Sequence, residues 1–332
     1  MNTTTEDNWY HKPLSSSDII AGGLLFCFAI IFLSLYIFTD IILYRKSNII
    51  TGFYFLLSAS IANILLLLSY SLWPSIFILF KKHYPECGRR IYQLYMDWIW
   101  FSMCYHIPLI AWTRLSAISH PLRFRLQKSS SIYISCILCY IISFLQSMII
   151  YFQPWYVTFY YEASAYGMVP ENVEQYLKGG KSMFFIIFHS IIIGTAFIFY
   201  SIAVFLLLKR RRRQIRNIIW STNIFASCKM SPKSNRVPSC TRMPNSMRIE
   251  IKTELMLKFR LISPCICSTV IFIIGQIVIV HGTGKGRWAT WLILVLFTFT
   301  AAIDPILLLI FSKYIRQVSF TFLFIIFCRF LI

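Results

Sequence analysis

A few charged residues lie inside long apolar stretches of this sequence, where an unpaired charge is expensive and usually has a function. Arg114 comes near the end of one stretch, and Asp97 stands 17 residues before it among tryptophans and tyrosines. Asp40 and Asp304 lie in the first and the last stretch. Because a buried carboxylate needs hydrogen-bond donors or a cation, these side chains are suited to binding a polar ligand or to joining helices.

The composition indicates that a membrane surrounds these charges. The 332 residues are 58% hydrophobic, 17% aromatic and only 13% charged, whereas a soluble domain carries roughly a quarter charged residues. Seven apolar blocks each supply the ~20 residues that a spanning helix needs. The sequence therefore predicts an all-α, integral membrane bundle of seven transmembrane helices, at Ile19–Tyr44, Ile49–Leu79, Tyr92–Ser119, Ile132–Phe152, Met183–Leu208, Phe259–Val280 and Ala289–Phe311.

Loop charge predicts the orientation of the bundle. The first block has no basic opening and is too long for a signal peptide, so we expect an uncleaved helix with the N-terminus outside. On that topology, Asn2 in the only glycosylation sequon lies outside. The cytoplasmic loops and helix ends then hold 23 of the 32 lysines and arginines, as the positive-inside rule requires. The short loops are nearly even, so the deciding feature is the run after the fifth block, Lys209, Arg210, Arg211, Arg212 and Arg213.

The position of the same basic run helps to interpret the net charge of +20. A nucleic-acid partner is not expected, because the run directly follows a membrane helix. A juxtamembrane basic segment attracts anionic lipids at about 1 kcal/mol per charge. The sequence shows no nucleophile–base pair, metal cluster or phosphate loop, so we expect neither an enzyme nor a cofactor.

The chain divides into an extracellular N-terminus (1–18), a seven-helix domain (19–311) and a cytoplasmic tail (312–332). The loop 209–258 mixes basic residues with three prolines and is predicted to be mostly disordered, although its start can prolong the fifth helix through Arg216. The apolar segment Phe320–Ile332 is too short to span a membrane. It is either a membrane-surface helix or a result of where the chain's end was defined.

Arg114 belongs to the most informative motif, which reads Thr113-Arg114-Leu115-Ser116-Ala117-Ile118-Ser119-His120-Pro121-Leu122. Pro121 forces the residue before it out of the helical region, so the helix must end there. Arg114 itself has two interpretations. Its side chain either snorkels to the membrane interface or turns toward the bundle as part of a switch.

This motif resembles the Asp-Arg-Tyr…Ala-Ile…Pro-Leu signature of rhodopsin-like seven-helix G-protein-coupled receptors, and the layout extends the resemblance over about 290 residues. Three short motifs are most similar to nematode serpentine chemoreceptors of the gamma and V classes: Phe53-Tyr54-Phe55-Leu56-Leu57, Glu254-Leu255 and Asp304-Pro305. The resemblance implies a chemosensory receptor in the plasma or ciliary membrane. Such a receptor binds an external small molecule and activates a heterotrimeric G protein, which docks where the basic run lies.

The chain departs from the receptor pattern in several places. Thr113 replaces the acid beside the arginine, and the loop Pro154–Lys181 has no cysteine for the usual disulfide to the top of helix 3. Helices 4, 5 and 6 lack their tryptophan, proline and Cys-Trp-x-Pro, and no tyrosine follows three residues after Pro305. These gaps indicate a divergent branch with altered activation, and they leave open a poorly coupled or non-functional member.

Because Thr113 cannot hold Arg114 electrostatically, another carboxylate is a candidate. Glu254 lies just before helix 6, and we predict that it pairs with Arg114 at rest and leaves it on activation. A partly exposed pair of this kind biases an equilibrium by about 1 kcal/mol. The alternative is that Glu254 is a solvated residue at the start of a helix.

Asp97 lies ~25 Å from Arg114 along a helix, near the outer end, beside Tyr95, Trp98 and Trp100. An acid among aromatic residues suits a cationic or hydrogen-bonding ligand, and receptors that the chain resembles bind ligands at this depth. The alternative is an aromatic belt at the membrane interface with an exposed aspartate.

Asn63 and Asp304 form the third candidate group. In the receptors that the chain resembles, helix 2 carries an acid and helix 7 an Asn-Pro, and here the two residue types look exchanged. An amide supplies the donors that a buried carboxylate needs, so we predict that Asn63 contacts Asp304. Asp40 either joins this cluster or approaches the cytoplasmic interface.

The main alternative to a receptor is a subunit of a multi-pass channel or transporter. An insect-type chemoreceptor channel also has seven helices, but its N-terminus is cytoplasmic, which the basic run Lys209–Arg213 opposes. The sequence shows no internal repeat of the kind that builds transporters from two related halves.

Overall fold

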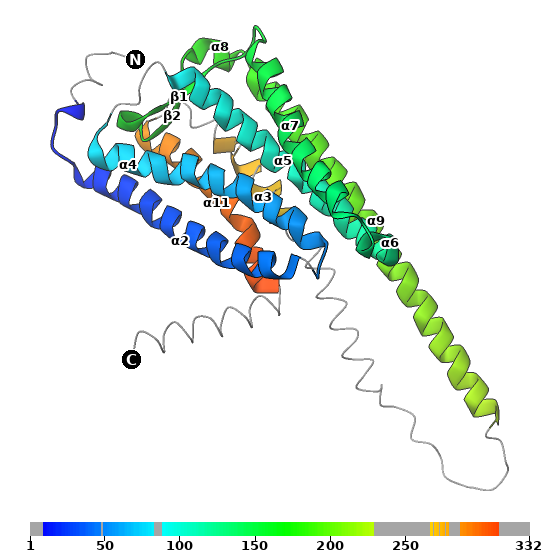
Figure 1. The fold of residues 1–332 in the computed structure, drawn as a ribbon. Helices are drawn as coiled ribbons and strands as arrows, with labels where there is room; N and C mark the ends of the chain where they lie inside the picture. Colours follow the sequence, from blue (N-terminus) through cyan, green and yellow to red (C-terminus); the bar gives the residue numbers. More distant parts are fainter. Residues whose placement is uncertain are drawn as a thin grey trace, which may run out of the picture.

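The computed structural model describes residues 9–47, 49–82, 88–228, 266–267, 269–271, 273–275, 277–278 and 286–311. Its long helices lie side by side in an all-α bundle (Figure 1), as the sequence predicts. Within the described part, five helices are long and apolar enough to cross a membrane: Ser16–Ser47, Gly52–Phe80, Ser129–Tyr151, Gly180–Arg210 and Arg287–Ile310. The chain is therefore a multi-pass membrane protein.

The helices follow the predicted blocks closely. The second span joins α3 (Gly52–Leu67), the π-helical turn η1 (Leu68–Leu72) and α4 (Trp73–Phe80). Two short helices, α6 (Pro121–Arg125) and α8 (Val173–Leu177), lie in connections. The described fragments between residues 266 and 278 are helical and fall within the predicted sixth block. The remaining long helices are α2 (Ser16–Ser47), α5 (Arg89–Ser119), α7 (Ser129–Tyr151), α9 (Gly180–Cys228) and α11 (Arg287–Phe311).

Helix α5 is the centre of the bundle, because it packs against α3, α7 and α9. We call the half of the bundle at the Arg89 end of α5 the outer half and the other the inner half. In the outer half of α5, the ring of Phe101 lies 5.0 Å from that of Phe188 on α9. In its inner half, Ala111 and Ala196 are fully buried, which lets the two helices approach closely. Helix α5 thus carries both the outer candidate residues and Arg114.

Local signals in the sequence explain several helix ends. Ser15 and Asp18 form a capping box at the start of α2, because each side chain accepts a hydrogen bond from the other residue's backbone N–H. Helix α4 ends at Lys81, whose φ of 48° lies in the left-handed region. Helix α5 ends before Pro121, where His120 has a φ of −133°, as the motif predicts.

The second span is not a regular α-helix. Pro74 lies in the first turn of α4, and a proline lacks the backbone N–H that would donate to a carbonyl of the preceding turn. The chain adopts the π-turn η1 there, and the carbonyl of Ser69 accepts a hydrogen bond from the Tyr92 hydroxyl at 3.2 Å. Such turns change the direction of nearby side chains, and η1 carries Tyr70, which lines the cavity described below.

The connection between α7 and α9 folds into an antiparallel hairpin, which we had not predicted. Strand β1 (Phe159–Glu162) and strand β2 (Gly167–Pro170) pair from Phe159 with Pro170 to Glu162 with Gly167. The turn between them is η3 (Ala163–Ala165), followed by Tyr166 with a positive φ of 57°. In Figure 1 the hairpin lies at the end of the bundle where α2 begins.

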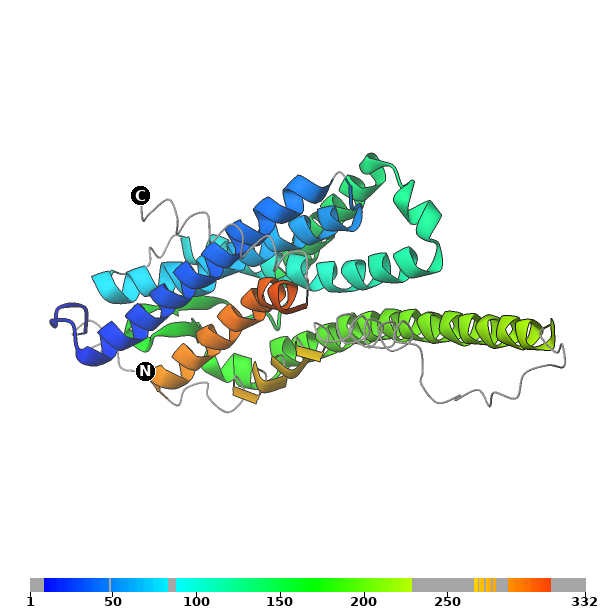
Figure 2. The same cartoon turned by 90° about the horizontal axis from the view of Figure 1, so that it is seen from below.

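Helix α9 runs well beyond the other helices, as Figure 2 shows. The predicted extension through Arg216 is confirmed, and the helix continues to Cys228. The expectation of disorder is therefore wrong for residues 209–228. Lysine and arginine are good helix formers, and the first proline of this segment, Pro232, comes only after the helix. Residues 229–258 and the tail 312–332 lie outside the described residues.

The outer faces of α7 and α9 are apolar. Ile137, Ile141 and Leu145 on α7 are about half exposed, as are Ile187 and Ile191 on α9. A water-soluble monomer rarely exposes so continuous an apolar surface. These faces are suited to lipid chains.

Candidate functional site

A partly open cavity of about 120 Å³ lies in the outer half of the bundle, whereas one water requires roughly 10–15 Å³. Most of its wall is aromatic or aliphatic, with a few polar groups, which is the usual make-up of a small-molecule site. The residues that line it come from η1, α5, the hairpin, α8, α9 and α11: Tyr70, Gln93, Met96, Asp97, Trp100, Phe159, Met168, Tyr176, Lys181, Ser182, Phe185, His189, Ile293 and Phe297.

Asp97 is a buried member of this wall, with 7% of its surface exposed. Its two carboxylate oxygens accept hydrogen bonds from Gln93 Nε2 at 2.8 Å and from the Tyr156 hydroxyl at 2.7 Å. The alternative of an exposed aspartate in an aromatic belt is therefore wrong. The carboxylate is held in place at the cavity, although whether it contacts a ligand stays a prediction.

Lys181 faces the same cavity from the start of α9 and is 4% exposed. Its ammonium donates a hydrogen bond to the Val157 carbonyl at 2.8 Å. It also lies 4.3 Å from the ring centre of Tyr156 and 4.8 Å from that of Phe159, within range of a cation–π interaction. Lys181 is near enough to Asp97 to interact with it electrostatically, so the cavity wall contains charges of both signs.

Trp100 contacts His189 across the cavity wall. The indole Nε1 donates to His189 Nε2 at 3.0 Å, and His189 Nδ1 lies 2.7 Å from the carbonyl of Phe185. These two contacts assign the proton to Nδ1, so the imidazole is neutral and both of its nitrogens are occupied. Trp100 lines the cavity, as predicted for a residue of the ligand site.

Tyr95 and Trp98 were predicted in the same ligand site, but neither lines this cavity. Trp98 turns toward α7, where its Nε1 donates to the carbonyl of Tyr140 at 2.9 Å and its ring packs against Phe144. Tyr95 packs edge-on against Trp98. Their part of the prediction is wrong for this cavity, because they lie on another face of α5 from Asp97.

The hairpin covers the outer end of the bundle without a disulfide. Phe159 and Met168 line the cavity from its two strands. The Tyr161 hydroxyl donates to the Pro74 carbonyl at 3.0 Å, and Thr290 Oγ1 donates to the Ala165 carbonyl. Gly167 lies so close to α11 that a Cβ there would come within 2.8 Å of the Thr290 carbonyl oxygen. These contacts fix the hairpin where receptors of the resembled class use a disulfide.

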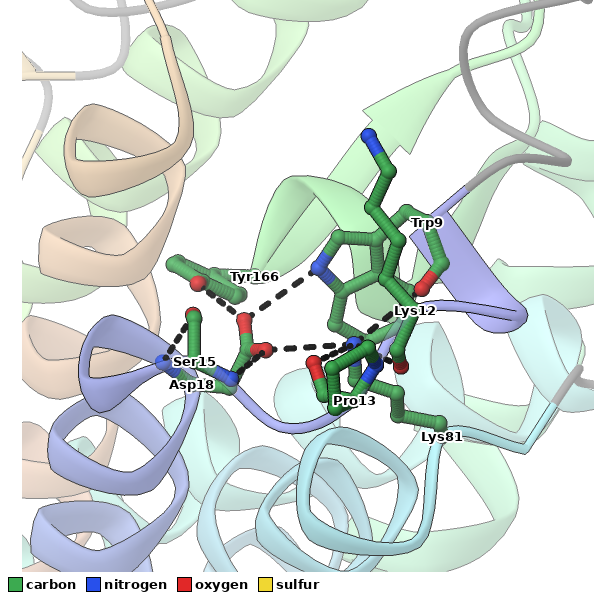
Figure 3. Close-up of polar contacts among 7 residues, drawn as sticks. All are labelled: Trp9, Lys12, Pro13, Ser15, Asp18, Lys81 and Tyr166. Carbon is green, nitrogen blue, oxygen red and sulfur yellow. Dashed lines mark hydrogen bonds and ion pairs between the residues drawn. The ribbon is translucent and has the colours of Figure 1, made fainter.

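A second set of contacts ties the N-terminal segment over the same end (Figure 3). The Asp18 carboxylate accepts hydrogen bonds from Trp9 Nε1 at 3.2 Å and from the Tyr166 hydroxyl, and it forms an ion pair with Lys81 Nζ at 3.3 Å. Lys81 also donates to three carbonyls of the segment, at 3.0–3.2 Å. We call Trp9, Ser15, Asp18, Lys81 and Tyr166 the outer clamp.

The ion pair of the outer clamp is shielded from solvent. The side chain of Asp18 is fully buried and that of Lys81 is 9% exposed. Burial and the neighbouring carboxylate raise the pKa of Tyr166 to about 12, so its phenol stays protonated and donates to Asp18. Beside the clamp, the Tyr10 hydroxyl donates to Glu162 Oε1 on the hairpin at 2.5 Å. The N-terminal segment and the hairpin thus form one cover.

The predicted contact between Asn63 and Asp304 is confirmed in the inner half of the bundle. Asn63 Nδ2 donates to Asp304 Oδ2 at 3.1 Å. Asp40 accepts a hydrogen bond from Ser60 Oγ at 2.7 Å, and Tyr36 between them donates to the Ala301 carbonyl. Asp40 therefore belongs to the same polar cluster, which joins α2, α3 and α11. Pro305 is buried beside it.

Arg114 turns into the bundle toward α9. Its Nη1 donates to the Tyr200 hydroxyl at 3.2 Å, and it interacts electrostatically with Asp304. Thr113 instead donates to the Ile110 carbonyl of its own helix at 2.8 Å, so it does not hold Arg114, as expected. The interpretation of Arg114 as a simple interfacial anchor is wrong, since its contacts are with other helices.

The remaining predicted residues lie on α9 or outside the described residues. Lys209, Arg210, Arg212 and Arg213 are exposed on α9, and Arg210 also donates to the Ser119 carbonyl at 3.3 Å. The side chain of Arg211 is not described. Glu254 and Asn2 lie outside the described residues, so the pairing of Glu254 with Arg114 and the glycosylation of Asn2 stay predictions.

Among solved structures, the chain is similar to squid rhodopsin, with a TM-score of 0.62 over 94% of this chain and 87% of that one. The chain has the rhodopsin-like seven-helix fold. The two sequences are 15% identical, so the likeness concerns the fold alone. No protein-family model and no curated protein sequence matches the chain.

The sequence analysis missed Lys181 and His189 as site residues. Lys181 directly follows Gly179-Gly180 and was counted with the outer loop, whereas the helix begins at Gly180 and carries it inward. His189 stands eight residues later in the same apolar block, and two or more turns of helix place both on one side. That spacing was the available signal.

Proposed function

We propose that this chain is a G-protein-coupled chemosensory receptor that binds an external small molecule in the outer cavity. One observation carries the proposal. A single helix, α5, contributes Asp97 and Trp100 to the cavity and Arg114 to the contacts at its other end. A ligand that shifts α5 relative to α9 therefore changes both sites together.

Several features support the finer parts of the proposal. The resemblance of the Arg114 motif to rhodopsin-like receptors supports coupling to a heterotrimeric G protein, with the basic run Lys209–Arg213 as a contact for it or for anionic lipids. The motifs shared with nematode serpentine receptors of the gamma and V classes support sensory perception in a plasma or ciliary membrane. No cofactor or nucleic acid is part of this function.

The test is ligand screening in cells that express the chain with a calcium or cyclic-nucleotide reporter. We expect a small external molecule to raise the reporter signal, and Asp97→Asn or Trp100→Ala to weaken that response at equal surface expression. Trp98→Phe is the matched control, because Trp98 packs against α7 and not in the cavity. A response unchanged by both cavity variants would refute the proposed site.

The switch at the inner end has its own test. We expect Glu254→Gln to raise basal signalling by up to about fivefold, because losing a pair worth about 1 kcal/mol shifts an equilibrium by that factor. Basal signalling is measured with the same reporter at matched expression. If Tyr200→Phe raises basal signalling and Glu254→Gln does not, the contact of Arg114 with Tyr200 holds the resting state. The proposed pair of Arg114 with Glu254 would then be refuted.

A further inference from the structure

The polar groups of the outer cavity differ in how far their hydrogen-bonding capacity is used. Trp100 and both nitrogens of His189 already bind each other or the backbone, so they have little to offer a ligand. Each oxygen of Asp97 has one donor, from Gln93 and from Tyr156. Each of these oxygens can still accept one more hydrogen bond, and further unused capacity lies elsewhere in the wall.

Gln93 and Lys181 provide this further capacity. Gln93 is 4% exposed, and its Oε1 has no hydrogen-bond partner within the part of the chain that the structure describes. The Lys181 ammonium has three N–H groups, and among described residues it has one acceptor, the Val157 carbonyl. Leaving such buried polar groups unsatisfied is costly. The cavity wall thus holds an unpaired acceptor, Gln93 Oε1, and a cation, Lys181, with N–H groups left for an oxygen acceptor.

The charges restrict the ligand further. Among the described residues that line the cavity, Asp97 and Lys181 are the two charged side chains, and they have opposite signs. A ligand with a net charge would add an unbalanced charge to a mostly apolar cavity that the hairpin helps to line, where burying a charge is expensive. A simple organic cation, which Asp97 alone would attract, meets Lys181 in the same cavity.

We propose that the outer cavity selects a small molecule of zero net charge with a carbonyl or carboxylate oxygen for Lys181 and an N–H for Gln93 and Asp97. The aromatic wall of Tyr70, Trp100 and Phe297, whose rings already pack on one another, suits an aromatic body. A neutral amide and a zwitterionic amino acid both satisfy this chemistry. This inference rests on the proposed function in using the cavity as the ligand site.

The test compares four probes of similar shape on the purified full chain in lipid nanodiscs, with thermal stability as the measure of binding. Benzamide is neutral, phenylglycine is zwitterionic, benzoate is an anion and benzylamine is a cation. Molecules of this size are expected to bind at about millimolar concentration. We expect benzamide, phenylglycine or both to raise the melting temperature, and both charged probes to leave it unchanged.

Two variants should change which probe binds best, one in favour of the cation and the other in favour of the anion. Lys181→Met leaves Asp97 unbalanced, so benzylamine should become the best probe and benzamide should bind about tenfold more weakly. Asp97→Asn leaves Lys181 unbalanced, so benzoate should become the best probe. Lys178→Met and Glu174→Gln are matched controls, because both residues are exposed outside the cavity, and they should keep the wild-type order.

If Lys181→Met does not fold, Lys181→Gln is used in its place, because glutamine keeps an N–H donor for the Val157 carbonyl. The proposal fails if a charged probe stabilises the wild-type chain most, if both variants keep its order, or if none of the four binds at millimolar concentration. Because binding is measured without a G protein, its outcome is separate from signalling. If the probes stabilise the chain in the predicted order but the cell reporter stays silent, the receptor function alone is refuted. If the reporter responds but both variants keep the wild-type order of probes, this inference alone is refuted.

Discussion

Buried and half-buried charges in the described bundle contact a side chain or a carbonyl from another part of the chain. Asp18 pairs with Lys81, Asp304 with Asn63 and Arg114 with Tyr200. Desolvation makes an unmet charge costly in a membrane interior, so complementary residue types tend to be brought together. For Asn63 and Asp304, that principle predicted the contact together with the receptor resemblance, in which the two residue types look exchanged between helices 2 and 7.

Exchanging Asn63 and Asp304 tests this contact. Asn63→Asp places two carboxylates against each other, and Asp304→Asn leaves Arg114 without its nearby acid, so each single change should lower stability by about 1–3 kcal/mol. The double variant restores one acid and one amide. We expect it to recover surface expression and melting temperature toward the wild-type values. A double variant as unstable as the sum of the single ones would show that the pair does not act as a unit.

The orientation of residues around α5 was harder to predict. Successive residues are 100° apart around a helix, so Gln93, Asp97 and Trp100 share one face while Tyr95 and Trp98 share another. The periodicity separates the two sets, but each contains a tryptophan, and both are suited to a helix interface. Only the packing of α7 against Trp98 and of α9 and α11 near Trp100 decides which face meets the cavity, and these contacts are distant in sequence.

At the scale of elements, the sequence predicts the spanning helices well because their apolar blocks are long. The described ends of α2, α3–α4, α5, α7 and α11 lie within three residues of the predicted bounds. Composition was misleading for α9, since a basic, polar segment can still be helical when its residues have high helix propensity. The hairpin was missed because its strands have four residues each and are stabilised by α11, α4 and the N-terminal segment.

The outer clamp allows a prediction for these joined elements. Lys81→Met removes the partner of a fully buried carboxylate and a donor to three backbone carbonyls, so stability should fall by about 3 kcal/mol. The melting temperature of the purified chain measures this, and Lys82→Met is the matched control because Lys82 is exposed at the next position. Equal effects of the two substitutions would mean that Lys81 does not anchor the N-terminal segment.

At the scale of the whole molecule, the two ends of the bundle differ in kind. One end is covered by the hairpin and the N-terminal segment, which bind each other through Tyr10 and Glu162 and through Tyr166 and Asp18. The other end carries the exposed basic residues of α9, which continues past the bundle (Figure 2). A ligand that enters at the covered end and a partner that binds at the basic end would act on opposite sides of a membrane.

The orientation of the bundle in that membrane is the most general prediction. Because Lys209, Arg210, Arg212 and Arg213 are exposed beside a spanning helix, the positive-inside rule places the basic end in the cytoplasm and the covered end outside. An N-terminal epitope should bind antibody on intact cells, whereas a C-terminal one should need permeabilised cells. In the same chain, Asn2→Gln should abolish a glycosidase-sensitive mobility shift. An N-terminal epitope reached only after permeabilisation would invert the topology, and the cavity could then not receive an external ligand.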